Sequence, residues 1–313
     1  MTEVRVFSAR EVELAVSPEA ALEAVRGAFL AHDRGEWTMP PKLYLTNYPA
    51  GDFRAMPALG GGHALLKWVT SFPGNPARGL PTVSGAVLVS NAETGELEAL
   101  LDAAAVTALR TGAAAVLAAE TLARDDASSA SVIGAGVNGR AAAAGFAARG
   151  RRPSIWDLDG ERARRVADEL GGTVAGSLEE ATRADIVVTV TPGRELLFVD
   201  GSLEPGQHVS LMGADGPGKA EIAPGELVRA RLFCDEWEQA SHSGEIAALV
   251  STGRIGRGEV TELGAVLAGA APGRQSGEEI TIFDSTGLAI QDLAIAIACL
   301  ERAAELDLPS VTL

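Results

Sequence analysis

The chain of 313 residues carries 26 lysine and arginine residues against 42 aspartate and glutamate residues, which gives a net charge of −16. This acidic excess argues against binding to nucleic acid or to an anionic membrane surface, because both are polyanions and would be repelled. Hydrophobic residues make up 47% of the chain, as in a folded globular protein. At about 150 residues per domain, the length predicts roughly two domains.

The N-terminal segment lacks the basic and apolar regions of a signal peptide, and no uninterrupted apolar run reaches the roughly 18 residues that a membrane span needs. Cys234 and Cys299 lie in apolar runs and match neither a disulfide framework nor a metal site. We therefore expect a cytoplasmic protein with two buried free thiols and no metal ion.

The first part of the chain, up to residue 110 or so, is heavily interrupted by glycine and proline. Strand-like segments lie between these turns at 43–45, 65–69 and 83–89. We predict an antiparallel, turn-rich domain here, joined to the next part of the chain by a helix over 103–122.

The central region alternates between strand-like and helix-like segments. We predict strands at 130–133, 154–156, 173–175, 186–190 and 208–212, and helices at 138–149, 161–170 and 178–182. Such alternation is typical of βαβ units around a parallel sheet, and it predicts an α/β fold with a Rossmann domain. A strand at 280–283 precedes an amphipathic helix at 288–306, which we expect to pack on the first domain. The predicted division is therefore a smaller α+β domain from 1–112 and 288–313, and a Rossmann domain from 113–287.

A glycine-rich turn follows the strand at 130–133. Gly134 to Gly139 reads GAGVNG and matches G-x-G-x-x-G between a strand and a helix. In such a turn Gly134 permits the tight bend, Gly136 lets the backbone approach a pyrophosphate, and Gly139 permits close packing. The helix start at Val137 and Asn138 presents free N–H groups to phosphates. The turn predicts dinucleotide binding.

Asp157 ends the next predicted strand, eighteen residues after Gly139. A carboxylate there accepts hydrogen bonds from the ribose 2′-hydroxyl and repels a 2′-phosphate, so NAD is favoured over NADP. Arginines at 162, 164 and 165 leave NADP open as an alternative, although such residues are more often simply part of a helix surface.

Ligands of open α/β sheets bind beyond the carboxyl ends of the strands, which here means the loops after Val190 and Met212. Thr191 begins the first loop and is a predicted cofactor contact. The second loop reads GADGPGK and contains Asp215, a candidate acid or base beside the nicotinamide. An aspartate that merely fixes a glycine-rich turn is an equally good interpretation from the residues alone.

Six longer motifs carry a family resemblance: LKWV, LPTV, TALRTGAAA, GADGPGKAE, SHSGE and FDSTG, which begin at 66, 80, 107, 213, 241 and 283. Together they resemble the ornithine cyclodeaminase/μ-crystallin family, in which an archaeal type of alanine dehydrogenase and several imino-acid reductases also belong. The resemblance implies a homodimer whose N-terminal part, completed by the C-terminal helix, builds the substrate side and the dimer interface.

The resemblance also implies roles for single residues. Arg110 would hold the α-carboxylate of the substrate through its planar guanidinium. Lys67 would be a second carboxylate contact and a proton donor, and Lys42 a third cation at the same end. Asp215 would be the catalytic carboxylate that meets the substrate nitrogen. Supporting contacts near the nicotinamide or the substrate are implied for Thr111 and Thr82.

One departure from the family pattern bears on the substrate. Ornithine cyclodeaminases have a glutamate just before a Met-Pro pair that receives the distal ammonium, whereas this chain has Arg54 before Met56-Pro57. A cation there would repel that ammonium by about 4 kcal/mol at 4 Å with an effective dielectric near 20. By resemblance to the alanine-dehydrogenase-like branch, Arg54 would instead bind either the α-carboxylate or a second carboxylate of the substrate. We therefore expect an NAD-dependent oxidoreductase that acts on the CH–NH bond of a small neutral or acidic amino acid. The alternatives are cyclodeamination with NAD recycled and non-catalytic ligand binding.

Overall fold

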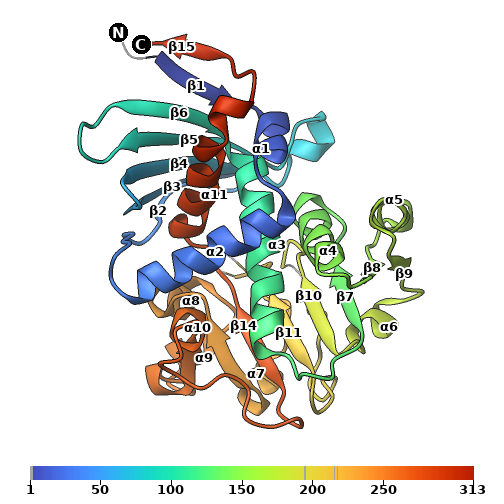
Figure 1. Ribbon diagram of the computed structural model, residues 1–313. Coiled ribbons are helices and arrows are strands. Elements are labelled where there is room, and N and C mark those ends of the chain that lie inside the picture. Colours follow the sequence, from blue (N-terminus) through green and yellow to red (C-terminus); the bar gives the residue numbers. More distant parts are fainter. Residues whose placement is uncertain (1–2, 194, 215, 217) are drawn as a thin grey trace. The chain divides into compact units, whose positions relative to one another are not determined.

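The computed structural model describes residues 3–193, 195–214, 216 and 218–313 (Figure 1). The chain divides into two compact units. Unit 1 is formed by Met1–Arg110 and Leu288–Leu313, and unit 2 by Thr111–Gly287. The boundary falls inside helix α3 (Ala103–Leu122), after Arg110.

Unit 1 is built on a seven-stranded sheet in the order β15-β1-β6-β5-β4-β3-β2. Its neighbouring strands are antiparallel except for β1 and β6, which run parallel. The strands are β1 (Glu3–Phe7), β2 (Leu43–Asn47), β3 (Gly51–Gly60), β4 (His63–Ser71), β5 (Val83–Asn91), β6 (Leu97–Asp102) and β15 (Ser310–Thr312). The helices are α1 (Ala9–Ala15), α2 (Pro18–Asp33) and α11 (Ala289–Glu301), with short 3-10 turns at Asn75–Arg78 and Ala303–Glu305.

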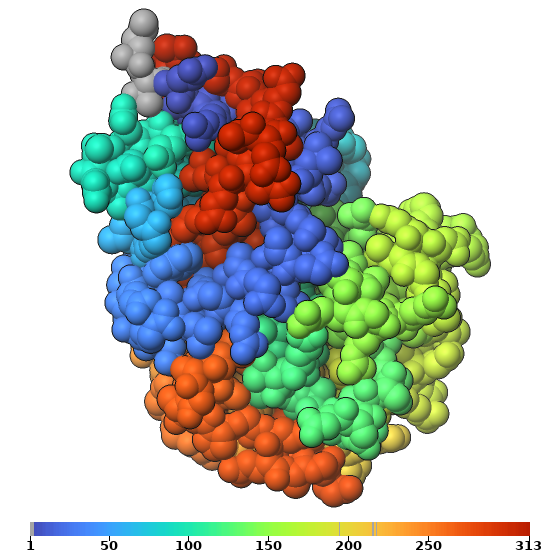
Figure 2. Space-filling view, viewed as in Figure 1, coloured from blue at the N-terminus to red at the C-terminus, as the bar shows by residue number. Residues whose placement is uncertain are grey.

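One face of this sheet is covered by helix. Side chains alternate along each strand, so Met56, Leu65 and Val87 share the buried face. Helix α11 packs on β3 and β4 and against α2, as expected for the C-terminal helix. In Figure 2 the C-terminal segment lies against the N-terminal segment on the surface of this unit. Two stretches that are far apart in the chain thus form one hydrophobic core.

The first 110 residues are less purely antiparallel and turn-rich than predicted, because they begin with β1 and two helices. Both helix starts carry ordinary signals. The N–H of Ser8 donates to the Glu11 carboxylate at 3.1 Å, and the N–H of Ala20 donates to Ser17 Oγ at 3.2 Å, with Pro18 in the first turn. The C-terminal helix ends at Glu301, earlier than predicted.

Unit 2 is built on an eight-stranded sheet in the order β13-β12-β14-β11-β10-β7-β8-β9, in which every neighbouring pair is parallel. The strands are β7 (Ala130–Ile133), β8 (Ser154–Trp156), β9 (Thr173–Val174), β10 (Ile186–Thr189), β11 (His208–Leu211), β12 (Arg231–Cys234), β13 (Val260–Glu262) and β14 (Thr281–Asp284). The helices besides α3 are α4 (Val137–Ala148), α5 (Gly160–Leu170), α6 (Leu178–Thr182), α7 (Pro224–Arg229), α8 (Trp237–Ser243), α9 (Ala247–Ser251) and α10 (Leu263–Leu267). The predicted Rossmann-type sheet is confirmed.

The strand order fixes where a ligand of unit 2 would bind. From β7 the chain builds β8 and β9 on one side and then returns with β10 on the other side of β7. The loops after β7 and β10 diverge at this switch point, which is the usual ligand crevice of such sheets. Gly134 follows β7 with φ +104°, and a Cβ there would lie 2.7 Å from the carbonyl oxygen of Val190. Only glycine fits.

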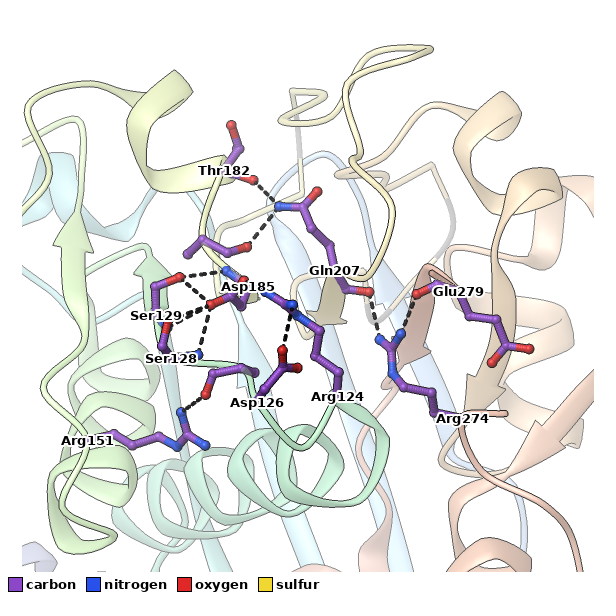
Figure 3. Close-up of polar contacts among 12 residues, drawn as sticks. Arg124, Asp126, Ser128, Ser129, Arg151, Thr182, Asp185, Gln207, Arg274 and Glu279 are labelled. Carbon is purple, nitrogen blue, oxygen red and sulfur yellow. Dashed lines mark hydrogen bonds and ion pairs between the residues drawn. The ribbon is translucent and has the colours of Figure 1, made fainter. Parts of the chain in front are cut away.

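The opposite, amino-terminal edge of the same sheet is held by ion pairs and hydrogen bonds (Figure 3). The carboxylate of Asp185, just before β10, accepts the N–H groups of Ser128 and Ser129 at 2.9 Å and pairs with the guanidinium of Arg124. Burial opposes the charge of this carboxylate, but these hydrogen bonds prevail and hold the pKa of Asp185 well below its usual range. The network fixes the loops at this edge.

Among the described residues, α3 is the helix long and apolar enough to cross a membrane, and 78% of its most apolar 18-residue window is buried. Such burial is typical of a core helix of a folded domain. Cys234 and Cys299 are buried free thiols, as predicted.

Candidate functional site

The glycine-rich turn of unit 2 has the shape that a pyrophosphate needs. A Cβ on Gly139 would lie 1.7 Å from the carbonyl oxygen of Gly134, so the start of α4 packs tightly against the turn. A Cβ on Gly136 would meet nothing within 4 Å, so the backbone there faces open space. Helix α4 starts at Val137, and its first N–H groups, including that of Asn138, lie at the positive end of the helix dipole. These residues fit a dinucleotide.

Asp157 lies directly after β8 and holds this turn. Its Oδ2 accepts the N–H of Ala135 at 2.7 Å, and its Oδ1 accepts the N–H of Asp159 at 2.8 Å. Arg162 Nη1 lies 3.7 Å from Oδ1. The carboxylate therefore stands at the end of the second strand, where sequence analysis expected a ribose contact, and its negative charge faces the nearest of the three arginines considered there.

Thr111 is the first residue of unit 2 and has an unusual hydroxyl. Elsewhere on α3 the Thr107 hydroxyl donates to the carbonyl oxygen of Ala103 at 2.6 Å, the normal arrangement in a helix. The Oγ1 of Thr111 is buried and has no hydrogen-bond partner among the described residues. Next to it, a Cβ on Gly112 would lie 2.6 Å from the backbone of Ala141 in α4. The unpaired hydroxyl of Thr111 thus lies where α3 packs against α4, the helix that follows the glycine-rich turn.

Glu221 joins the loops that follow β10 and β11. Its carboxylate accepts the Thr189 hydroxyl at 2.6 Å, both the N–H and the hydroxyl of Thr191 at 3.1 and 2.5 Å, and the N–H of Gly213 at 3.0 Å. Burial raises the pKa of this carboxyl. Thr191, a predicted cofactor contact, therefore has both of its donors directed at Glu221. A Cβ on Gly213 would lie 2.5 Å from the Glu221 carboxyl carbon, which explains the glycine.

Two further carboxylates anchor the SHSGE and FDSTG motifs to this edge of the sheet. Asp235, after β12, accepts the N–H groups of Thr286 and Gly287 at 2.8 and 2.7 Å. Glu245 accepts the N–H of Glu221 at 2.7 Å. Burial, together with the charges of Asp284 and Glu221, raises the pKa of Glu245 to about 9. The three C-terminal motifs of the resemblance thus meet around buried carboxyl groups.

Asp215, the predicted catalytic carboxylate, lies outside the described residues. A cavity of 280 Å³ is lined by its neighbours Gly216 and Lys219, by His242 and Glu245, and by apolar side chains of α7 and α9. This cavity is at the carboxyl ends of the strands, within unit 2.

Unit 1 gathers a second set of predicted residues around Asp292 of α11. The ammonium of Lys67, on β4, donates to Asp292 Oδ1 at 2.9 Å and to Thr107 Oγ1 at 2.6 Å. Arg110 Nε lies 3.3 Å from the same Oδ1, and Arg110 Nη1 donates to Gln291 Oε1 at 3.4 Å. Lys67 is 1% exposed and Asp292 is fully buried. Lys67 and Arg110 are therefore not solvated surface charges.

The environment of Lys67 changes its acidity. Burial lowers the pKa of its ammonium to about 8, and the charges of Arg110 and Arg54 act in the same direction, whereas Asp292 opposes them. A lysine with such a pKa can give up a proton near neutral pH. Its chemistry fits the predicted role of a proton donor.

Arg54 is also buried, but it has a counter-ion that sequence analysis did not foresee. Its Nε donates to Asp52 Oδ1 at 2.6 Å, and its guanidinium lies 5.3 Å from the ring centre of Tyr44. The repulsion of about 4 kcal/mol between Arg54 and a distal ammonium assumes that Arg54 has no counter-ion. Because the carboxylate of Asp52 pairs with Arg54, that figure is too large. Lys42 precedes β2 and is partly buried, and Thr82 lies in the turn before β5.

Sequence analysis missed the buried partners of the predicted site residues. Asp292, Gln291, Asp52 and Glu221 were not singled out, although all four are buried. A signal was present, because an aspartate inside the apolar run AIQDLAIAIA is almost never buried without a partner.

Comparisons with known proteins find relatives over nearly the whole chain. Residues 2–307 match the model of the ornithine cyclodeaminase/mu-crystallin family. The chain is 42% identical to the alanine dehydrogenase of Archaeoglobus fulgidus, over 96% of this chain and 95% of the relative. It is 34% identical to the iminosuccinate reductase of Paracoccus denitrificans, over 95% and 96%. An archaeal alanine dehydrogenase dimer with bound NAD superposes with a TM-score of 0.93 at 40% identity, covering 99% of each chain. With a match over nearly its whole length, the chain belongs to the ornithine cyclodeaminase/mu-crystallin family.

Proposed function

We propose that this protein is a cytoplasmic, NAD-dependent oxidoreductase that acts on the Cα–N bond of a small neutral or acidic amino acid. It interconverts the amino acid with the corresponding imine, or with the 2-oxo acid and ammonia. The observation that carries the proposal is the buried group in unit 1, where Lys67 and Arg110 share the carboxylate of Asp292. Alanine dehydrogenase and iminosuccinate reductase, both similar over nearly the whole chain, support the reaction class.

NAD is held by the glycine-rich turn. Gly136 gives the pyrophosphate access to the backbone, the start of α4 binds its charge, and Asp157 accepts from the ribose. The buried hydroxyl of Thr111 is a further donor or acceptor for the cofactor. When bound as NADH, the cofactor supplies a hydride.

The cations of unit 1 orient the other reactant. Gln291 Nε2 is buried without a hydrogen-bond partner among the described residues, and this amide N–H and the guanidinium of Arg110 are donors that suit the α-carboxylate. Lys67 adds a positive charge, and its proton balances the reaction. In the reductive direction the imine carbon gains a hydride and the imine nitrogen gains a proton, which gives the amine. Asp215, by family resemblance, holds that nitrogen.

The test is oxidation of NADH in the presence of ammonia and a panel of pyruvate, glyoxylate, oxaloacetate and pyrroline-2-carboxylate. We expect consumption of NADH with at least one of them. Replacement of Lys67 by Gln should lower turnover by roughly 100- to 10,000-fold, the range for loss of a general acid, while binding of NADH stays unchanged.

Cyclodeamination is the second candidate, because Asp52 offsets the charge of Arg54 and so removes part of the argument against a diamine. The same assay therefore includes L-ornithine with catalytic NAD. Proline formation without accumulation of NADH would replace the proposed reaction with a cyclodeaminase. NADH binding with no turnover of any substrate would instead indicate ligand binding alone.

A further inference from the structure

We propose that Asp292 is a positioning residue for the reaction: it anchors the Lys67 ammonium and the Arg110 guanidinium from helix α11 and keeps Lys67 in its charged form. This inference rests on the proposed function, which assigns those two cations to the substrate. The role of Asp292 goes beyond the carboxylate contacts that the family resemblance implies.

The geometry leaves Lys67 with one defined orientation. An ammonium has three donors. One is directed at Asp292 Oδ1 and one at Thr107 Oγ1, at 2.9 and 2.6 Å. Since the Thr107 hydroxyl gives its own hydrogen to the carbonyl of Ala103, its oxygen accepts from Lys67. Two of the three donors are therefore fixed by the protein, and the third direction is left for a ligand.

The charges around Lys67 make Asp292 decisive. Among the described residues, three charged groups face Lys67: Asp292 from α11, Arg110 from α3 and Arg54 from β3. Of these, Arg54 has its own counter-ion, Asp52. Burial, Arg110 and Arg54 all favour the neutral amine, and Asp292 is the carboxylate that favours the ammonium. If the negative charge of Asp292 were removed, the pKa of Lys67 would fall further below about 8, and the ammonium would be lost near neutral pH.

The group formed by Asp292, its two cations and Gln291 does not satisfy all of its own hydrogen-bonding atoms. Asp292 Oδ2 and Gln291 Nε2 are buried side-chain atoms without a hydrogen-bond partner in the part of the chain that the structure describes. Buried polar atoms are nearly always satisfied, and those that are not call for an explanation. Two of them in one group, one acceptor and one donor, indicate that a ligand with both donors and acceptors completes it.

The composition of the chain permits a direct test, because it contains only three lysines, Lys42, Lys67 and Lys219. Protein labelled with carbon-13 at the lysine ε-carbon gives three resonances, and Lys67→Arg assigns one of them. We expect Lys67 to titrate near pH 8 in the unaltered protein. In Asp292→Asn the midpoint should fall by at least about one pH unit, which is a tenfold change in the ratio of ammonium to amine.

Asp102→Asn is the matched control, since Asp102 lies in the same unit but its Oδ1 accepts the N–H of Ala105 at the start of α3. It should leave the Lys67 midpoint unchanged. Asp292→Glu retains the charge and should restore the midpoint while raising the KM for the carboxylate substrate. Asp292→Ser takes the place of the Asn variant if the latter does not fold.

Steady-state reduction of the best substrate gives the second measurement. In Asp292→Asn we expect the decline of kcat/KM with rising pH to begin at a lower pH, in step with the Lys67 resonance. An unchanged Lys67 midpoint in both Asp292→Asn and Asp292→Ser would overturn the inference. A shifted midpoint with no substrate reduced would sustain the control of the Lys67 charge by Asp292 and reject the proposed reaction.

Discussion

Asp157 performs two tasks with one carboxylate. It accepts the N–H of Ala135, which shapes the glycine-rich turn, and it places a negative charge at the end of β8. The two tasks respond differently to substitution, because an amide oxygen can still accept a hydrogen bond but carries no charge. A substitution of Asp157 can therefore change the preference between NAD and NADP without changing the structure of the turn.

In Asp157→Asn we expect NADH to be used nearly as before and the ratio of kcat/KM for NADPH to that for NADH to rise at least about tenfold, or ~1.4 kcal/mol. The reason is loss of repulsion between the carboxylate and the 2′-phosphate. The matched control is Asp159→Asn, since Asp159 caps α5 by accepting the N–H of Glu161 at 3.1 Å. An unchanged ratio would assign the preference to other residues, with Arg162 as the first to examine.

Single residues also show how far the sequence could be interpreted. Lys67 and Arg110 were predicted because each lies inside a motif of the family resemblance. Their shared partner Asp292 was not, because it lies 225 residues from Lys67 along the chain, and no local pattern connects them. Arg54 was predicted as a cation, but its pairing with Asp52 two residues earlier depends on strand geometry, which places both side chains on the same face.

At the scale of elements, the parallel sheet has two edges with different tasks. The carboxyl edge carries the glycine-rich turn and the loops joined by Glu221, whereas the amino edge is closed by the hydrogen bonds of Asp185 (Figure 3). The second edge is suited to structural stability. Its central carboxylate should affect unfolding without affecting the cofactor.

We expect Asp185→Asn to lower the free energy of unfolding at neutral pH by about 1–3 kcal/mol, because several hydrogen-bond donors lose an ionised acceptor. The pKa of Asp185 is lowered in the folded state, so this stabilisation is present above the unfolded pKa near 3.9 and is lost as pH falls through the folded value. Denaturant unfolding should show the variant and the unaltered protein converging in acid.

Asp126→Asn is the control for this experiment, since Asp126 pairs with the same Arg124 at 3.2 Å but its side chain is 79% exposed. Exposed pairs contribute about 0–1 kcal/mol. A difference between Asp185→Asn and the unaltered protein that did not shrink in acid would contradict the ionic explanation.

Elements with a strong local pattern were predicted well. The strands at Ala130–Ile133 and Ser154–Trp156 and the helix Ala103–Leu122 have the bounds expected from the sequence, because apolar runs end there at glycine or polar residues. The N-terminal helices were missed because glycine and proline further along dominated the interpretation, although the caps at Ser8 and Ser17 are ordinary signals.

At the scale of the whole molecule, the uncovered face of the seven-stranded sheet is apolar. Strand register places Leu43, Leu45, Leu59, Leu66 and Trp68 on the same face, opposite to the one that contacts α11, and each is between 37% and 59% exposed. Exposed apolar patches of this kind mark interfaces. We propose that this protein forms a homodimer and that this face is its interface.

Light scattering after size-exclusion chromatography should give a mass near twice 32.2 kDa. Trp68→Glu should shift the protein to the monomer, because a charge buried in an apolar interface is costly. Leu158→Glu, at an 86% exposed position in unit 2, should leave the dimer intact. A monomeric unaltered protein, or a dimer that tolerates Trp68→Glu, would remove this face from the interface.

Unit 1 is formed by two stretches of the chain that are separated by unit 2, and this determines the order in which its parts are synthesised. A ribosome delivers β1 to β6 with Lys67, then all of unit 2, and only afterwards the segment with α11 and β15. Until then Lys67 lacks its partner Asp292, and the apolar face of the seven-stranded sheet lacks helix α11. During translation the glycine-rich turn can therefore form before the group of Lys67, Arg110 and Asp292 is complete. The nascent chain would then be able to bind a nucleotide before it is able to turn over substrate.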